Sequence, residues 1–272
     1  MVDPRLVAVL TSERARGCHT MDGGGRAPRS RIPEPDRQAV LDAAAVLQVR
    51  RTETATALAE GRAVDAEIVG GDERLGQMLL DEQASWTELL SVRPAVTATQ
   101  LAASLPNTRA LLERGLRMIS IYDGDGIAPD ARLVLAGEPT GTYLLSVAPV
   151  QMKIVNRSRV LLQGPVVDGS GTVMAVRSQV CLAAAWRYWD AVLETAFPVA
   201  SVVDPPADLT PRQRQVVALL GTGAGDDAIA SALGVSVRTV RSDVARILDS
   251  LGVQSRFAAG VRLHRWSDGA ES

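Results

Sequence analysis

The sequence has very few of the residues that build metal centres and disulfide frameworks. Its 272 residues include two cysteines and two histidines. Cys18 and Cys181 lie far apart, and the chain contains no C-x-x-C pair and no Cys/His spacing of the zinc-binding kind. We therefore expect two reduced thiols, no disulfide framework, no zinc site and no other cofactor.

Long apolar runs are missing as well. No window approaches the ~20 uninterrupted apolar residues of a membrane span, and the N-terminal residues lack the apolar block of a signal peptide. These two absences predict a cytoplasmic protein without a membrane partner. Lysine is almost absent, because Lys153 is the only one and arginine carries nearly all of the basic charge.

The length of the chain suits two domains joined by a linker. With 46% hydrophobic residues, a chain of 272 residues can bury one large core or two modest ones. Residues 1–35 are broken by glycine and proline and predict a disordered N-terminal arm. The proline-containing residues 201–208 predict a linker between a domain at 36–200 and a domain at 209–272.

Residues 36–200 have the pattern of an α/β domain. A helical period begins with Val40, Ala44 and Leu47 on one face and continues to about residue 60. Further runs indicate a strand at 63–69, helices at 72–83 and 105–115, a strand at 116–123, four short strands at 142–148, 151–156, 159–164 and 171–177, and a long apolar helix at 178–197. We predict one mixed sheet with helices packed on it, in a domain that senses a signal or mediates dimerisation.

The C-terminal residues combine several features of a helix-turn-helix. Thr210 can cap a helix that has Pro211 at its first position, where the missing N–H costs nothing. Gly234 permits a tight turn, and Ser236 can cap the following helix. That helix carries an apolar stripe at i, i+4, i+7 and i+11, made of Val240, Val244, Ile247 and Leu251.

The other face of the same helix is basic. It presents Arg238, Thr239, Arg241, Ser242, Ala245 and Arg246, beside the cap residue Ser236. Arginine and hydroxyl side chains donate to phosphate oxygens and to guanine edges. We predict that Arg241 and Ser242 face base edges, and that the phosphate contacts come from Arg238, Thr239 and Arg246. The alternative is an ordinary solvated helix face.

These residues resemble the LuxR-type helix-turn-helix domain, a four-helix DNA-binding module, over residues 209–264. In this resemblance LTPR opens the first helix, IASALGVS carries the helix and turn, RTVRSDVARIL is the recognition helix, and LGVQSR leads into the last helix. Double-stranded DNA is then the expected partner, bound by a homodimer on two half-sites. A regulator of this kind also has RNA polymerase as a candidate contact.

Three positions depart from the pattern of that family. Gln213 and Gln215 stand where glutamates are common, so the ion pair that such glutamates would make with Arg256 is absent. Asp243 stands where the recognition helix usually carries histidine. A carboxylate near phosphates weakens binding unless it pairs with an arginine such as Arg246. The sequence preference of the family is therefore not transferable.

The run QMKIVNRSRVLL resembles the phospholipase D-like fold, whose signature is H-x-K-x-x-x-x-D. On that signature the chain has Gln151 for the histidine, keeps Lys153, and has Ser158 for the aspartate. The chemistry needs one histidine to attack phosphorus and another to protonate the leaving group, yet the only histidines are His19 and His264. We expect no enzyme, and Lys153 is either an anion-binding residue or a structural lysine.

Two other groups of residues admit both a functional and a structural interpretation. Asp123 and Asp125 follow a strand, as in a phosphorelay receiver, but the composition favours an ordinary turn at 123–126. Trp186, Tyr188 and Trp189 could stack on a ligand, although core or interface anchors are the commoner use of such aromatics.

We therefore predict a cytoplasmic DNA-binding transcriptional regulator with a sensor or dimerisation domain. The leading alternative is an interaction or scaffold protein that uses the helix-turn-helix as a dimer surface without specific DNA contact; an enzyme is third. The candidate self-association surfaces are the stripe of Val40, Ala44 and Leu47 and the pair Trp186 and Trp189, unless both pack internally.

Overall fold

A single mixed sheet organises the protein. The computed structural model describes residues 32–62, 64–71, 85–167, 169–201, 209–256 and 259. Within these ranges eight strands form one sheet, in the spatial order β1 (Ala66–Gly71), β7 (Thr172–Val176), β6 (Arg159–Gln163), β5 (Met152–Val155), β2 (Glu88–Arg93), β3 (Arg117–Asp123), β4 (Thr142–Ser146) and β8 (Phe197–Pro198). The α/β prediction is confirmed, whereas the finer phospholipase D-like prediction is not.

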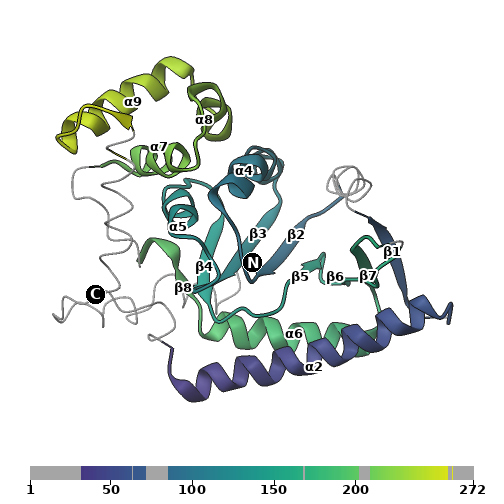
Figure 1. Ribbon diagram of the computed structural model, residues 1–272. Coiled ribbons are helices and arrows are strands. Elements are labelled where there is room, and N and C mark those ends of the chain that lie inside the picture. Colours follow the sequence, from purple (N-terminus) through teal and green to yellow (C-terminus); the bar gives the residue numbers. More distant parts are fainter. Residues whose placement is uncertain are drawn as a thin grey trace.

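Helices cover both faces of this sheet. Helices α2 (Glu34–Ala59) and α6 (Gln179–Glu194) pack on one face, and α4 (Ala98–Glu113) and α5 (Pro129–Ala136) lie on the other (Figure 1). Strands β2, β3 and β4 are parallel, with α4 and α5 as their crossover connections. The carboxyl ends of β2 and β3 therefore lie side by side, below the two helices.

The apolar stripe of α2 packs inside the molecule. Val40, Ala44 and Leu47 are buried in one cluster with residues of α6 and of the sheet. Trp189 is also buried there, and Trp186 is partly buried against the same cluster. The two surfaces that the sequence offered for self-association are thus covered within the chain, and internal packing, the stated alternative, is correct.

Asp123 connects the loops at the carboxyl ends of β3 and β4. One carboxylate oxygen accepts hydrogen bonds from the backbone N–H groups of Asp125 (3.0 Å) and Gly126 (3.1 Å), and the other accepts from Ala148 N–H (2.8 Å). The side chain is buried. Asp123 therefore closes the ordinary turn that the composition predicted, and both of its carboxylate oxygens accept hydrogen bonds from backbone N–H groups.

Several helix boundaries differ from the prediction. Helix α4 begins at Ala98, ahead of the predicted residue 105, because Thr97 and Gln100 form a capping box, and Pro106 lies inside the helix. Helix α5 was not predicted, although Pro129 at its first turn is a common start signal. The predictions for residues 1–31, 72–83 and 202–208 lie outside the described residues.

The three described helices of the C-terminal domain pack directly on α4 and α5. They are α7 (Pro211–Gly221), α8 (Asp226–Leu233) and α9 (Val237–Ser250). One hydrophobic cluster runs from Tyr122 and Leu145 of the sheet through Val134 of α5 to Val216 and Val240. Helix α7 contacts α5, helix α8 contacts α4, and α9 lies on the far side of both (Figure 1).

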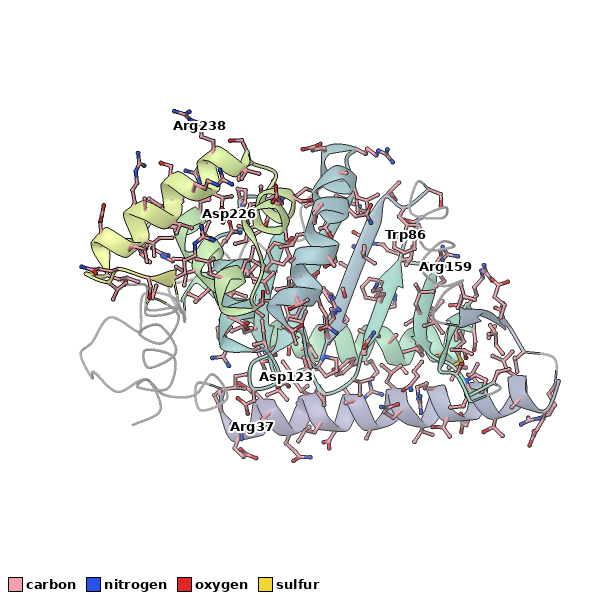
Figure 2. The ribbon with its side chains drawn as sticks, turned by 45° about the horizontal axis from the view of Figure 1, so that its top comes forward. Arg37, Trp86, Asp123, Arg159, Asp226 and Arg238 are labelled. Carbon is pink, nitrogen blue, oxygen red and sulfur yellow. The ribbon has the colours of Figure 1, made fainter. Side chains whose placement is uncertain are left out.

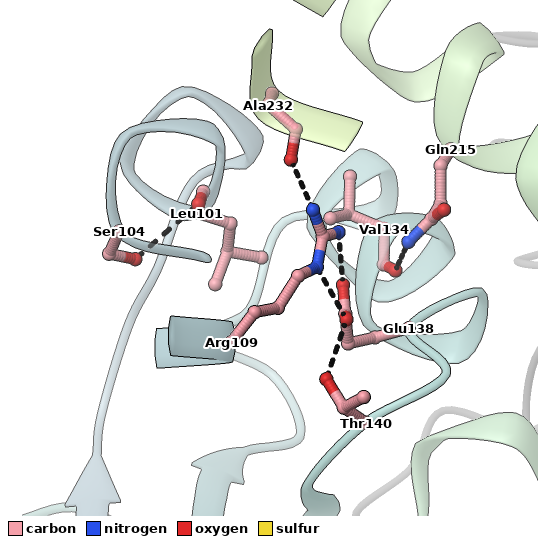
Figure 3. Close-up of polar contacts among 8 residues, drawn as sticks. All are labelled: Leu101, Ser104, Arg109, Val134, Glu138, Thr140, Gln215 and Ala232. Carbon is pink, nitrogen blue, oxygen red and sulfur yellow. Dashed lines mark hydrogen bonds and ion pairs between the residues drawn. The ribbon is translucent and has the colours of Figure 1, made fainter. Parts of the chain in front are cut away.

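Polar groups join the two parts where the helices meet. The Arg109 guanidinium of α4 forms two hydrogen bonds to Glu138, 2.8 and 2.7 Å long, and a third of 2.7 Å to the Ala232 carbonyl at the end of α8 (Figure 3). The hydrogen bonds to Glu138 raise the pKa of Arg109 above its ordinary value. Gln215 of α7 donates a hydrogen bond of 2.9 Å to the Val134 carbonyl of α5. These contacts fix how the C-terminal helices sit on the sheet domain.

We expect Arg109→Ala to destabilise the protein strongly, because it leaves the fully buried Glu138 side chain without its counter-charge. Breaking a buried ion pair costs about 3–5 kcal/mol, and urea denaturation measures that loss in the free energy of unfolding. The matched control is Arg114→Ala, since Arg114 is exposed at the end of the same helix. It should change stability by less than about 0.5 kcal/mol. Equal effects of the two substitutions would contradict this role of Arg109.

Candidate nucleic-acid interface

The turn between α8 and α9 has the geometry that its sequence predicts. Gly234 ends α8 in the left-handed conformation, with φ at 65°, which side chains with a Cβ rarely adopt. The Ser236 hydroxyl oxygen then accepts a hydrogen bond of 3.1 Å from Thr239 N–H and caps α9. Thr210 likewise caps α7, with Pro211 at the first helical position. All three predicted features are confirmed.

Helix α9 buries one face and exposes the other. The apolar stripe of Val240, Val244, Ile247 and Leu251 is buried, as predicted. On the opposite face the exposed residues are Ser236, Arg238, Arg241, Ser242, Ala245 and Arg246, and Thr239 is half-buried. Figure 2 shows Arg238 projecting away from the body of the protein. The predicted DNA-contacting residues thus share one accessible basic face, turned away from the sheet.

Asp243 lies beneath this face. Its side chain is only 2% exposed and accepts hydrogen bonds of 2.7 and 3.3 Å from Arg212 of α7. These bonds raise the pKa of Arg212. Asp243 therefore does pair with an arginine, but its partner is Arg212 of α7, whereas Arg246 was the example named from the sequence. The carboxylate holds α9 to α7, and its charge is matched before any ligand approaches.

A second carboxylate orients Arg241. Asp226, the first residue of α8, lies 3.1 Å from the Arg241 guanidinium and 2.7 Å from that of Arg256. The hydrogen bond with Arg256, and that with Arg241, lower the pKa of Asp226. Because the Arg241 side chain stays 70% exposed, it is held in place yet remains able to reach a ligand. The sequence reasoning missed Asp226, although an acidic residue in the first turn of α8 was a visible signal.

The glutamines of α7 have structural roles. Gln213 completes the capping box with Thr210. Gln215 reaches across to α5, and there is no room for a Cβ at Gly137, where it would lie 2.6 Å from both Gln215 Cγ and the Pro211 carbonyl oxygen. The ion pair that glutamates would make with Arg256 is replaced by the pair with Asp226. Gln215 and Gly137 therefore support the packing of the C-terminal helices on α5 of the sheet domain.

The phospholipase-like positions lie on and beside β5. Gln151 is exposed ahead of β5, Lys153 lies on β5 beside Ser91 of β2, and Ser158 stands in the turn to β6. Among the described residues no group of three His, Cys, Asp or Glu side chains could hold a metal ion. The described helices include none that is long and apolar enough to cross a membrane.

The aromatic side chains of α6 act as anchors. The Tyr188 hydroxyl donates to the Val150 carbonyl (3.2 Å) and accepts from Val150 N–H (3.0 Å), while the ring is buried. Trp189 is buried as well. Trp186 is half-buried, with the Arg157 guanidinium 5.5 Å from its ring centre. The commoner of the two interpretations, anchoring, describes Tyr188 and Trp189.

Two comparisons relate the chain to known regulatory proteins. Residues 207–262 match the family described as bacterial regulatory proteins, luxR family, so the chain carries a luxR-type helix-turn-helix at this end. It is also similar to the bialaphos biosynthetic pathway regulatory protein of Streptomyces hygroscopicus, with 29% identity over 139 residues. This match covers 49% of the chain and 54% of the relative, so the chain spans about half the length of that relative.

We expect Asp243→Asn to change stability and to leave the affinity for duplex DNA nearly constant. The variant removes the negative charge and one of the two oxygens that accept hydrogen bonds from Arg212. Losing a hydrogen bond to a charged group costs about 1.5–3 kcal/mol, to be measured by urea denaturation. Affinity should rise less than about threefold at physiological salt, because the carboxylate faces away from the ligand. The control is Asp249→Asn, on the exposed side of α9. A gain of about tenfold or more for Asp243→Asn alone would show that the carboxylate faces the DNA.

Proposed function

We propose that the protein is a sequence-specific DNA-binding transcriptional regulator that inserts α9 into the major groove. The observation that carries this proposal is the exposed basic face of α9 above a fully buried apolar stripe. The match of residues 207–262 to a family of regulatory proteins supports it, as does the name of the Streptomyces relative. An α-helix fits the major groove, where each base pair presents a distinct pattern.

In this proposal Arg241 and Ser242 read base edges, and Arg238, Thr239 and Arg246 hold phosphates. Arg241 is the best candidate for bidentate recognition of guanine, because the Asp226 carboxylate fixes its orientation beforehand. The contact between Ser236 and Thr239 hydroxyls, 2.8 Å apart, places both at the N-terminus of α9. Backbone N–H groups at a helix N-terminus favour phosphate oxygens.

We further propose that the regulator acts as a homodimer in the cytoplasm and that its sheet domain senses a signal. One helix-turn-helix makes few phosphate contacts, so useful affinity normally requires two copies on half-sites. The exposed apolar residues of α2, Leu41, Val46 and Val49, are the remaining candidates for self-association on that helix. A contact with RNA polymerase would follow from the regulatory role.

The first test compares arginines on and off the proposed interface. Arg241→Ala should weaken binding to a duplex selected from a random library by about 1–3 kcal/mol and relax the base preference at one position. Arg246→Ala should weaken binding to all duplexes alike and reduce the salt slope by about one. Arg187→Ala, which removes the same charge from an exposed site on α6, should change neither quantity.

Two outcomes of that comparison would favour other functions. Unchanged discrimination by Arg241→Ala would remove the assignment of base contacts. Binding by the wild-type protein that is independent of salt would favour the scaffold alternative, because a domain that contacts phosphates loses affinity as salt rises.

We propose that the sheet domain has no phosphodiesterase activity. With Gln151 and Ser158 at the motif positions, the domain lacks both the nucleophile and its partner. No turnover of lipid, nucleotide or nucleic-acid phosphodiesters should be measured, whichever divalent metal is added. Turnover that disappears in Lys153→Met but persists in Arg187→Ala would overturn this proposal.

A further inference from the structure

Two basic side chains share the face of the sheet that carries α4 and α5. In the register of the central strands, Lys153 of β5 stands beside Ser91 of β2, and Ser91 stands beside Ser120 of β3. Two residues further along the same strands, Arg93 stands beside Tyr122. Because alternate residues of a strand point to one side, all five side chains project from one face.

The two cations have no carboxylate partner within the described part of the chain. Lys153 makes no ion pair or hydrogen bond there, and the interaction found for it is repulsion from Arg93. Arg93 contacts the ring of Tyr122, with 6.0 Å from its guanidinium carbon to the ring centre. Burial, with a smaller contribution from the Arg93 charge, lowers the pKa of Lys153 to about 8. The nearby carboxylate of Asp123 is engaged with backbone N–H groups.

The two cations on this face repel each other. Arg93 and Lys153 are each half-buried, and like charges in a partly desolvated position destabilise the fold unless a counter-charge joins them. The hydroxyl groups of Ser91, Ser120 and Tyr122 are hydrogen-bond donors on the same face, and all three residues are buried. Burial raises the pKa of Tyr122, so its phenol keeps its proton. Two cations and the hydroxyl groups beside them, of which that of Tyr122 is hydrogen-bonded with Arg93 and Ser120, match the charge and the acceptors of a dianionic phosphate group.

We propose that Arg93 and Lys153 form a binding site for a phosphate group, carried by a small phosphorylated molecule or present as inorganic phosphate. The proposal names the ligand class of the sensor domain and so rests in part on the proposed function. Arg93 and Tyr122 lie outside the phospholipase-like motif, and the pairing of the two cations comes from the sheet register.

The position of the site links it to the C-terminal helices. Arg93 ends β2, and residues 94–97 lead from it to α4; Tyr122 is followed by Asp123 and the turn that leads to α5. The two connections touch, because Ala128 N–H donates to the Val96 carbonyl (3.3 Å) and a Cβ on Gly126 would lie 1.8 Å from the Pro94 carbonyl oxygen. A phosphate that draws Arg93 toward Lys153 therefore acts on the segments that precede both docking helices.

The scarcity of lysine makes a direct test available. Because Lys153 is the only lysine, full-length protein labelled with ¹³C at lysine Cε gives one side-chain resonance. Titration with inorganic phosphate should shift this resonance saturably and raise the pKa of Lys153, whereas chloride at equal ionic strength should not. Arg93→Gln should weaken phosphate binding by about tenfold or more, and Arg187→Gln should leave it unchanged. A resonance that does not respond, or responds equally to chloride, would overturn the proposal.

Stability gives a second readout that a structural lysine would not produce. Phosphate should raise the thermal midpoint of the wild-type protein by mass action. Lys153→Met should raise the midpoint of the phosphate-free protein, because a half-buried cation without a counter-charge is removed, and should abolish the response to phosphate. A lower midpoint for Lys153→Met, with the phosphate response retained, would assign Lys153 a structural role and overturn the proposal.

Two further measurements identify the source of the phosphate group and test whether the site regulates DNA binding. Glycerol phosphate that binds more tightly than inorganic phosphate indicates that the ligand is a phosphorylated molecule. Equal or weaker binding of glycerol phosphate indicates the free ion. If neither compound binds, the proposed site is overturned. Affinity for the selected duplex is measured with and without phosphate. Absent DNA binding with an intact Lys153 response would refute the proposed function alone, whereas DNA binding without any Lys153 response would refute the phosphate site alone.

Discussion

The arrangement of the whole molecule depends on one half-buried arginine. Arg109 binds both carboxylate oxygens of Glu138 and also the terminal carbonyl of α8. The guanidinium therefore joins three separate segments: the helix that follows β2, the loop that follows α5, and the helix that precedes the recognition helix. A planar group with five donors can satisfy such a set of acceptors, whereas a lysine ammonium has fewer donors and no fixed fork. The apolar cluster around Arg109 provides the buried contact area between the sheet domain and the C-terminal helices. The hydrogen bonds of Arg109 determine how α8 is oriented on α4.

The same principle recurs at smaller scale around α9. Asp243 and Asp226 each bind an arginine of a neighbouring segment, and neither carboxylate belongs to the outer face of the recognition helix. The two carboxylates thus lie beneath and beside the basic face. Asp243 joins α9 to α7, and Asp226 joins α8 to α9. The net charge of −2 for the chain says little about this face, because local placement of charge decides which ligand is attracted.

Features that depend on local sequence could be predicted. The stripe from Val240 to Leu251, the caps at Thr210 and Ser236, and the strands of the antiparallel half follow from periodicity and turn residues. Features that depend on a distant partner could not be predicted. An arginine such as Arg246 was named as the partner of Asp243, because nothing near Asp243 in the sequence indicates that its partner is Arg212 of α7. Helix α5 is short, and its buried residues pack in one cluster with α4, the sheet and α7.

The lateral docking of α7 and α8 has a consequence for the geometry of recognition. A DNA-binding domain attached only through a tether can adjust to half-sites at different separations, since the chain between the domains absorbs the change. Here α7 and α8 rest on α5 and α4 through buried contacts, so α9 has a set direction relative to the sheet. If two copies pair through their sheet domains, the distance between their recognition helices becomes a property of the fold, and inserting a few base pairs between half-sites would rotate one half-site out of reach.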